Sequence, residues 1–250
     1  MSRYSILIPA KNEEENIVET IQAIRSLFIQ ENIVYEIIVV NDHSTDQTLE
    51  AIQKLSLHDP AIWTVNNPYP GGVGHAIRYG LERFNGDYVV IVMADGSDDP
   101  RDILKYIRET KKGFDCCFGS RWEKDVKVTN YPKHKLFLNR LVNRCIGWLF
   151  GLGYFDITNA FKCYSRNTIK GITPVLSRHF NFTVELPLKA IVRGYNYAIV
   201  PTHWYGRKRG ISSLKIKEMG SRYMFIIIYI FLEKLLCGKD YGKKQFEEKA

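Results

Sequence analysis

The chain has 250 residues, of which 45% are hydrophobic and 25% charged, and it carries a formal net charge of +8. This composition is that of an ordinary globular protein with a sizeable core, in one large or two small domains. The five cysteines show no paired metal-ligand spacing and the first residues contain no long apolar stretch, so we expect reduced thiols in a cytosolic setting and no signal peptide.

The first 120 residues alternate predicted strands and helices joined by short connections. Strands are expected over residues 5–9, 35–40, 61–65, 88–93 and 114–119, and helices over residues 12–30, 46–57, 74–84 and 100–112. Because a helix separates each strand from the next, the pattern indicates right-handed crossovers. The predicted fold class is α/β: a doubly wound, mostly parallel sheet with helices on both faces.

Beyond residue 121 the alternation ends. Helices are expected over residues 136–150 and 181–193, followed by a strand over residues 195–200, a basic loop and a C-terminal amphipathic helix. The chain has no long linker rich in Pro, Gly or Ser and no internal repeat. We therefore expect one catalytic domain over residues 1–214 and an appendage over residues 215–250 that associates with a membrane or a partner.

The positive charge gathers in two segments, residues 124–144 and 207–217, and each leads into an amphipathic, aromatic-rich stretch. Such clusters attract nucleic acid, an anionic membrane or a phosphorylated substrate, or are simply solvated. The apolar run over residues 223–232 is shorter than the roughly 18 residues that cross a bilayer. It suits a helix lying in the membrane interface, with a buried core helix as the alternative.

Polar loops follow four of the predicted strands, at residues 9–14, 41–46, 66–74 and 95–99. The last of these loops places several carboxylates directly after a buried strand. Because the carboxyl ends of parallel strands share one edge of a sheet, we expect the four loops to converge there. Glycines in the third loop allow the backbone to approach an anion, although a simple loop is the alternative. The loop is not a P-loop, since no Gly-Lys-Ser/Thr sequence ends it.

Several segments resemble the motifs of family 2 glycosyltransferases. These segments begin with Pro9-Ala10-Lys11-Asn12-Glu13, Val40-Asn41-Asp42-His43-Ser44-Thr45-Asp46-Gln47-Thr48 and Met93-Ala94-Asp95. Later segments resemble the dolichyl-phosphate mannose synthase and polyprenyl-phosphate glycosyltransferase branch, namely Gly119-Ser120-Arg121, Asp156-Ile157-Thr158-Asn159-Ala160-Phe161-Lys162, Phe182-Thr183-Val184-Glu185 and Arg207-Lys208-Arg209-Gly210-Ile211-Ser212-Ser213-Leu214. Seven motifs in the right order span residues 6 to about 214.

The resemblance implies a GT-A-like fold that binds a nucleoside diphosphate sugar, with guanosine and uridine donors both compatible with the motifs. Pro9, Asn12 and Glu13 would lie near the nucleoside, and Asp42 would accept hydrogen bonds from the base, whose edge offers N–H donors. An Asx-turn or a helix cap is the alternative role for Asp42. Gly72 and Gly74 are expected where the backbone approaches the donor.

The resemblance also implies Mg²⁺ or Mn²⁺, hard cations that bridge protein carboxylates and substrate phosphates. Asp95 is the leading ligand, with Ser97 and Asp98 as further ligands. Met93 replaces the first Asp of the family motif, and a thioether is a poor ligand for such a cation. In the alternative, Asp95 only caps a helix and basic residues alone neutralise the diphosphate.

Arg121, Lys162 and Arg207 are the expected cations beside the leaving diphosphate, where negative charge grows in the transition state. Each has the alternative role of a surface or structural base. Lys162 stands where the family has Arg and cannot form a bidentate fork. Glu185 would act as a general base toward a sugar hydroxyl, whereas toward an anionic lipid phosphate it would orient other groups, and a structural ion pair is the alternative.

The sequence thus predicts an inverting glycosyltransferase that acts on a polyprenyl or dolichyl phosphate, peripherally at the cytoplasmic face of a membrane. The runner-up acceptor is a hydroxyl of a glycan or a lipid-linked saccharide. A nucleotidyltransferase would carry a Gly-rich basic loop after the first strand, and residues 9–14 are not one. A nucleic-acid-binding module is disfavoured because acids at strand ends repel phosphates. Whether a separate membrane-anchoring subunit exists stays open.

Overall fold

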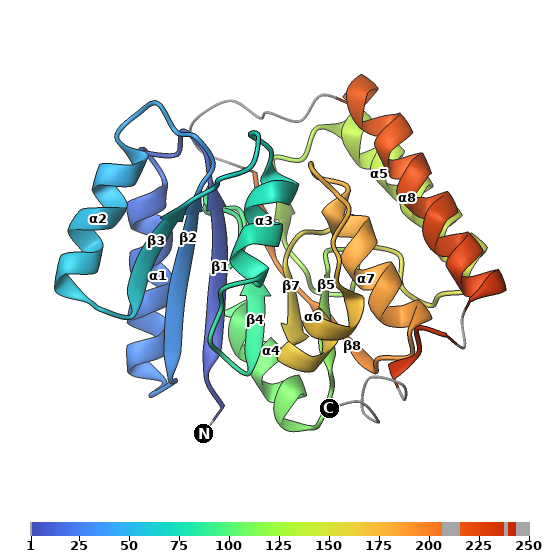
Figure 1. Cartoon of the computed structure of the whole chain (residues 1–250), viewed down its shortest axis with the longest axis horizontal. Coiled ribbons are helices and arrows are strands. Elements are labelled where there is room, and N and C mark those ends of the chain that lie inside the picture. The colour runs from blue at the N-terminus through green and yellow to red at the C-terminus, as the bar shows by residue number, and fades with distance from the viewer. Residues whose placement is uncertain (1, 207–215, 238–239, 244–250) are drawn as a thin grey trace.

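The computed structural model describes residues 2–206, 216–237 and 240–243. Its centre is a seven-stranded sheet with the order β3-β2-β1-β4-β7-β5-β8, flanked by helices (Figure 1). The strands of this sheet are β1 (Tyr4–Ala10), β2 (Tyr35–Asn41), β3 (Ile62–Asn66), β4 (Tyr88–Ile91), β5 (Cys116–Ser120), β7 (Lys162–Ser165) and β8 (Tyr197–Pro201). Two short strands, β6 (Val128–Thr129) and β9 (Trp204–Tyr205), pair separately in parallel.

The sheet is parallel except at one strand. β1 pairs in parallel with β2 and β4, β2 with β3, and β5 with β8, whereas β7 runs antiparallel to both β4 and β5. The predicted mostly parallel α/β sheet is confirmed. β7 was not among the predicted strands, because its four residues follow a turn-rich stretch without a preceding helix.

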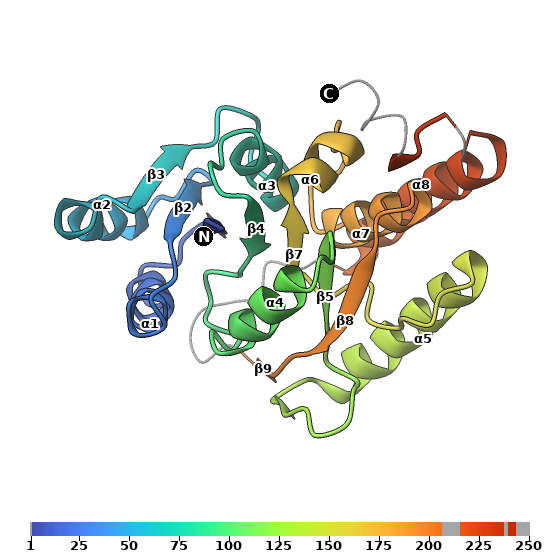
Figure 2. The ribbon, with the colours of Figure 1, turned by 90° about the horizontal axis from the view of Figure 1, so that it is seen from below.

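Helices cover both faces of the sheet (Figure 2). They are α1 (Ile17–Gln30), α2 (Thr48–His58), α3 (Val73–Leu81), α4 (Asp102–Lys111), α5 (Lys133–Phe150), α6 (Arg166–Ile172), α7 (Phe182–Val192) and α8 (Ile216–Leu236). Alternate side chains of β1 serve two cores, since Leu7 packs in the cluster that includes α3 and α7, and Ile6 and Ile8 pack in the cluster that includes α1 and α4.

Helix α1 begins five residues later than the sequence pattern predicts. Asn12 has a φ of 54°, in the left-handed region, and the amides of Asn16 and Ile17 both donate to the carbonyl of Glu13. The segment from Asn12 to Asn16 therefore forms a turn, which leaves the polar residues after β1 at the edge of the sheet.

Helix α8 packs on α7 and α5. The Arg193 guanidinium pairs with the Glu233 carboxylate at 2.7 Å, and both side chains are buried. On the other side, Lys234 Nζ donates to the carbonyl oxygen of Phe150 at 2.8 Å, and the rings of Phe150 and Phe231 meet edge to face. Within the described ranges, no helix combines the length and the apolar character needed to cross a membrane.

Candidate functional site

The loops after β1, β2 and β3 meet at one edge of the sheet. The register aligns Ala10 with Asn41, and Asn41 with Asn66, so these three strands end together. Around Gly71 the loops come into contact: a Cβ added there would lie 3.5 Å from Lys11 Nζ and 4.0 Å from an oxygen of Asp42. The convergence expected from the sequence is therefore present for these loops.

Asp42 is buried and its carboxylate organises the loop after β3. Its Oδ1 accepts a hydrogen bond from Asn67 Nδ2 at 2.7 Å, and its Oδ2 accepts one from the Gly72 amide at 2.8 Å. The Asp42 carboxylate, which we expected to accept hydrogen bonds from the nucleotide base, thus already accepts hydrogen bonds from two groups of the protein. Asn67 was missed by sequence reasoning, because only the folded chain brings it to Asp42.

Asn12 and Glu13 connect the loop after β1 to the loop after β2. Asn12 Oδ1 accepts from the Thr45 amide at 2.8 Å, and the Glu13 amide donates to Thr48 Oγ1 at 2.8 Å. Pro9 lies within β1, where it is aligned with Val40. These contacts give the first two loops one fixed relative position.

Gly72 and Gly74 lie against the backbone of the loop that precedes α7, which we call the 174–181 loop. A Cβ on Gly72 would lie 2.5 Å from the Arg178 carbonyl oxygen, and one on Gly74 would lie 2.5 Å from the Ser177 carbonyl oxygen. The Gly74 amide donates to the Arg178 carbonyl at 3.1 Å. Glycine is therefore required at positions 72 and 74 because the backbone of the 174–181 loop lies too close for a Cβ. The expected close approach to the donor is, in this structure, a close approach to the protein's own backbone.

Glu185 fixes the 174–181 loop from the opposite side. The side chain is fully buried, and its two oxygens accept hydrogen bonds from the amides of Leu176 and Ser177, each at 2.7 Å. Lys189 Nζ donates to Glu185 Oε1 at 2.6 Å and to the Pro174 carbonyl at 2.6 Å. The carboxylate is thus paired and hydrogen-bonded, an arrangement that suits an orienting group better than a proton acceptor.

The acids after β4 lie together but in different surroundings. Asp95 is half-buried, and its Oδ1 accepts from the Ser97 amide at 3.1 Å. Asp98 is buried, and its Oδ2 accepts from the Met93 amide at 3.3 Å. Burial, followed by the nearby negative charge of Asp95, raises the pKa of Asp98 to about 7. Asp99 pairs with Arg101 instead.

Asp95 and Asp98 fit a divalent cation only if a bound ligand supplies the remaining oxygen atoms. In the part of the chain that the structure describes, no three His, Cys, Asp or Glu side chains are grouped to hold a metal. The negative charge of Asp95 raises the pKa of Asp98, so the two carboxylates lie near each other, and together they are a suitable donor set for Mg²⁺ or Mn²⁺, which take further oxygens from substrate phosphates and water. Asp95 and Asp98 would hold such a cation.

Arg121 and Lys162 are both engaged by the protein. Arg121 forms a two-point ion pair with Asp156, at 2.9 Å from Nε and 2.7 Å from Nη2, and both side chains are buried. Lys162 Nζ donates to the carbonyls of Ile157, at 2.8 Å, and Asn159. Burial lowers the pKa of Lys162 to about 7. Arg207, the third expected cation, lies outside the described residues.

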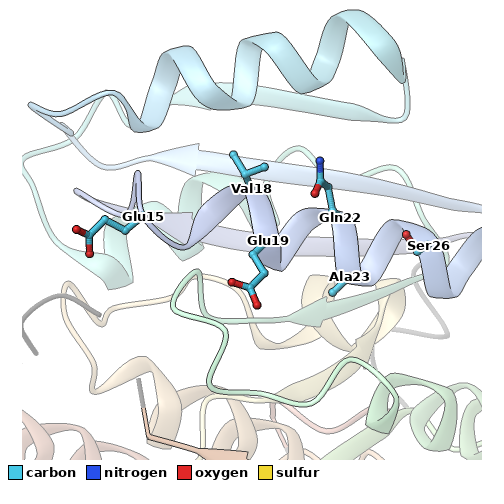
Figure 3. Close-up of a pocket in the computed structure, with 6 residues that line it drawn as sticks. All are labelled: Glu15, Val18, Glu19, Gln22, Ala23 and Ser26. Atoms are coloured by element: carbon cyan, nitrogen blue, oxygen red, sulfur yellow. The ribbon is translucent and has the colours of Figure 1, made fainter. Parts of the chain in front are cut away.

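A hollow of about 480 Å³ lies along α1 and the turn before it (Figure 3). The side chains that line it come from one short segment and include Glu15 and Glu19. The described residues that line the hollow include no Lys or Arg that could bind a diphosphate, and carboxylates repel one. The hollow is therefore not the expected donor site, in spite of its size.

The chain matches known proteins over most of its length. The family model described as "Glycosyl transferase family 2" matches residues 5–176. The chain is 30% identical over 220 residues to "Polyprenol monophosphomannose synthase" of Mycolicibacterium smegmatis, covering 85% of this chain and 81% of the relative. It is 33% identical over 138 residues to "Dolichol-phosphate mannosyltransferase" of Pyrococcus furiosus, covering 55% of this chain and 38% of that relative.

Solved structures share the fold. Glucosyl-3-phosphoglycerate synthase from Mycobacterium tuberculosis, in a complex with Mn²⁺, uridine diphosphate and phosphoglyceric acid, superposes with a TM-score of 0.68 at 17% identity. The match covers 93% of this chain and 78% of that chain. The same enzyme with Mg²⁺ and uridine diphosphate gives a TM-score of 0.67 at 17% identity, over 93% of this chain and 79% of that chain. At these identities the likeness establishes the GT-A architecture.

The contact between Gly74 and the 174–181 loop predicts a stability effect. In Gly74→Ala, the added Cβ meets backbone rather than a flexible side chain, so we expect the free energy of unfolding to fall by about 1–3 kcal/mol. Gly153→Ala is the matched control, since a Cβ there has no heavy atom within 4 Å, and we expect a change below about 0.5 kcal/mol. Equal denaturant midpoints for the two variants would contradict the contact.

Proposed function

Because the chain belongs to glycosyltransferase family 2, we propose that it transfers a sugar from a nucleoside diphosphate to the phosphate of a polyprenyl or dolichyl lipid. The observation that carries this proposal is the match to a polyprenol monophosphomannose synthase across most of both chains. A second relative, named for dolichol phosphate, supports the same class of acceptor.

The surroundings of Glu185 support a phosphate acceptor over a hydroxyl acceptor. A hydroxyl must lose its proton as it attacks, whereas a phosphate is already an anionic nucleophile at neutral pH. Glu185 was the base candidate for a hydroxyl, and its oxygens are occupied by two amides and the Lys189 ammonium. An acceptor that needs no proton removal agrees with this arrangement.

We place the donor diphosphate beside the acids that follow β4 and the loop of Gly71–Gly74. Solved structures of the same fold contain Mn²⁺ or Mg²⁺ together with uridine diphosphate, which supports a divalent cation held by Asp95 and Asp98. Such a cation supplies positive charge to the departing diphosphate. Lys11, whose ammonium lies near Gly71 and Asp42, adds a positive charge at the same edge.

The proposed reaction is a single displacement at the anomeric carbon. An oxygen of the lipid phosphate forms a bond to this carbon while the bond from the carbon to the diphosphate oxygen breaks, which inverts the configuration. Negative charge grows on the leaving diphosphate, so positive charge near it acts mainly in the transition state. The ion pair between Arg121 and Asp156 fixes the segment after β5. The positive charge of Arg121 acts on Asp98, because it lowers the pKa of the Asp98 carboxyl whereas burial raises it.

We propose that the protein associates peripherally with the cytoplasmic face of a membrane through α5 and α8, the latter within the appendage over residues 215–250. The two helices lie side by side on one flank of the molecule (Figures 1 and 2). Each exposes large apolar side chains, among them Phe137 at 72% and Trp148 at 90% on α5, and Leu235 at 62% on α8. Exposed Arg140 and Arg144 on α5 would meet anionic headgroups.

The acceptor is tested by incubating the protein with Mn²⁺, radiolabelled nucleotide sugars with guanosine or uridine bases, and either a polyprenyl phosphate or free glycans. We expect label in a lipid-linked sugar phosphate with at least one donor, and inverted configuration at its anomeric carbon. Glu19→Gln, which alters the hollow along α1, should leave the rate unchanged. Label found only in a hydroxyl-linked product would contradict the proposal that a lipid phosphate is the acceptor.

The membrane surface is tested by sedimentation with vesicles of phosphatidylcholine and phosphatidylglycerol. Burying each large apolar side chain contributes about 1.5–3 kcal/mol, so Phe137→Glu combined with Leu235→Glu should weaken binding about tenfold or more. Leu57→Glu is the control, because Leu57 is 84% exposed on α2, at the opposite flank (Figure 1). If the double variant Phe137→Glu/Leu235→Glu sediments with the vesicles like the parent protein, α5 and α8 are not the membrane surface.

A further inference from the structure

A cavity of about 420 Å³ lies between the 174–181 loop and the first described turns of α8. Its lining includes Leu176, Arg178, His179, Asn181, Arg222 and Phe225. In Figure 1 this loop and the start of α8 lie at the same upper edge as the loops that follow β1 and β2. The elements that line the cavity therefore lie on the side of the molecule where we place the donor.

The polar part of the cavity is suited to an anion. Arg178 is exposed and Arg222 is half-buried, and neither guanidinium forms an ion pair with a carboxylate of the described ranges. Guanidinium groups bind phosphate with paired, charge-assisted hydrogen bonds. His179 and Asn181 add further polar side chains on the same loop. Two cations at one cavity favour a ligand with a doubly charged group, such as a phosphate monoester.

The lining also has an apolar part, formed by Leu176, Phe225 and Ile226 beside Ser221, and exposed apolar side chains continue from it along α8. Phe225 is 61% exposed and Leu176 is 41% exposed, whereas Ile226 is buried beneath them. One helical turn further on, Ile228 is 50% exposed. A ligand with a phosphate head and an apolar chain would thus find cations at one end and a continuous apolar path at the other.

The 174–181 loop, which carries Arg178, is fixed by hydrogen bonds to α7 and to the start of α3. Glu185 binds the amides of Leu176 and Ser177, and the Gly74 amide donates to the carbonyl of Arg178 itself. The side chain of Arg178 is therefore attached to a backbone that touches the loop after β3. The loop that carries Arg178 therefore contacts the segment beside which we place the donor diphosphate.

We propose that this cavity binds the phosphate of the acceptor lipid, with Arg178 and Arg222 as its ligands and the exposed face of α8 as the path of the chain. The inference rests on the proposed function, since it assigns a subsite to the acceptor of that reaction. It adds two residues that the sequence motifs do not include and that line one cavity from two different elements, the 174–181 loop and α8.

The test measures binding of farnesyl phosphate by calorimetry, without donor, to the parent protein and to Arg178→Ala, Arg222→Ala and the double variant. A lost charge-assisted hydrogen bond weakens binding roughly tenfold, so each single variant should show about this loss and the double variant more. Arg108→Ala, an exposed arginine on α4, is the matched control and should bind like the parent. Farnesol should bind weakly and equally to all variants, and inorganic phosphate should bind through the same two arginines.

Transfer assays and vesicle binding distinguish two lipids that could place a phosphate in the cavity, the isoprenyl phosphate acceptor and an anionic membrane phospholipid. If the cavity holds the acceptor, the variants raise the KM for the isoprenyl phosphate and leave the KM for the donor unchanged. If they lose binding to phosphatidylglycerol vesicles while keeping the parent affinity for farnesyl phosphate, the acceptor assignment is overturned. Parent-like affinity in the double variant also overturns it. Arginine-dependent binding without any sugar transfer would support the cavity and refute the proposed function.

Discussion

The parallel pairing of β3, β2, β1 and β4 is the constraint on which the rest of the site depends. Backbone hydrogen bonds align Ala10, Asn41 and Asn66, so the chain must leave all three strands at the same edge. Polar groups far apart in the sequence then meet without any long-range attraction between them. Asp42 uses this proximity to bind Asn67 and Gly72, which joins the loop after β2 to the loop after β3, and Asn12 and Glu13 join the loop after β1 to them.

A second contact joins this surface to the remainder of the chain. Gly74 allows the 174–181 loop to approach the backbone, and the buried Glu185 carboxylate holds that loop from behind. The part of the molecule that carries β1 to β3 and the part that carries α7 are therefore connected by a contact between backbone atoms, the hydrogen bond from the Gly74 amide to the Arg178 carbonyl. The buried Glu185 carboxylate thus has a structural role, because it binds the amides of Leu176 and Ser177 and the Lys189 ammonium.

Much of the fold could be predicted from the sequence because local patterns encode it. Alternating apolar strands and amphipathic helices predict the parallel sheet, and ordered motifs predict the family. The partners of the motif residues could not be predicted in this way. Arg121 carries no sign in its own segment that Asp156 holds it, and Glu185 carries none that it binds Leu176. Such pairs form between elements that meet only after folding, and Arg178 matches no motif at all.

We propose that Asp95 and Asp98 hold a divalent cation together with the donor diphosphate, in spite of Met93 at the first motif position. The most direct test of this proposal is a Mn²⁺ titration followed by electron paramagnetic resonance, with uridine or guanosine diphosphate present. We expect one tight Mn²⁺ site in the parent protein, with an affinity that falls about tenfold or more in Asp95→Asn and is unchanged in Glu19→Gln. Equal Mn²⁺ affinity in the parent protein and Asp95→Asn would contradict the proposal.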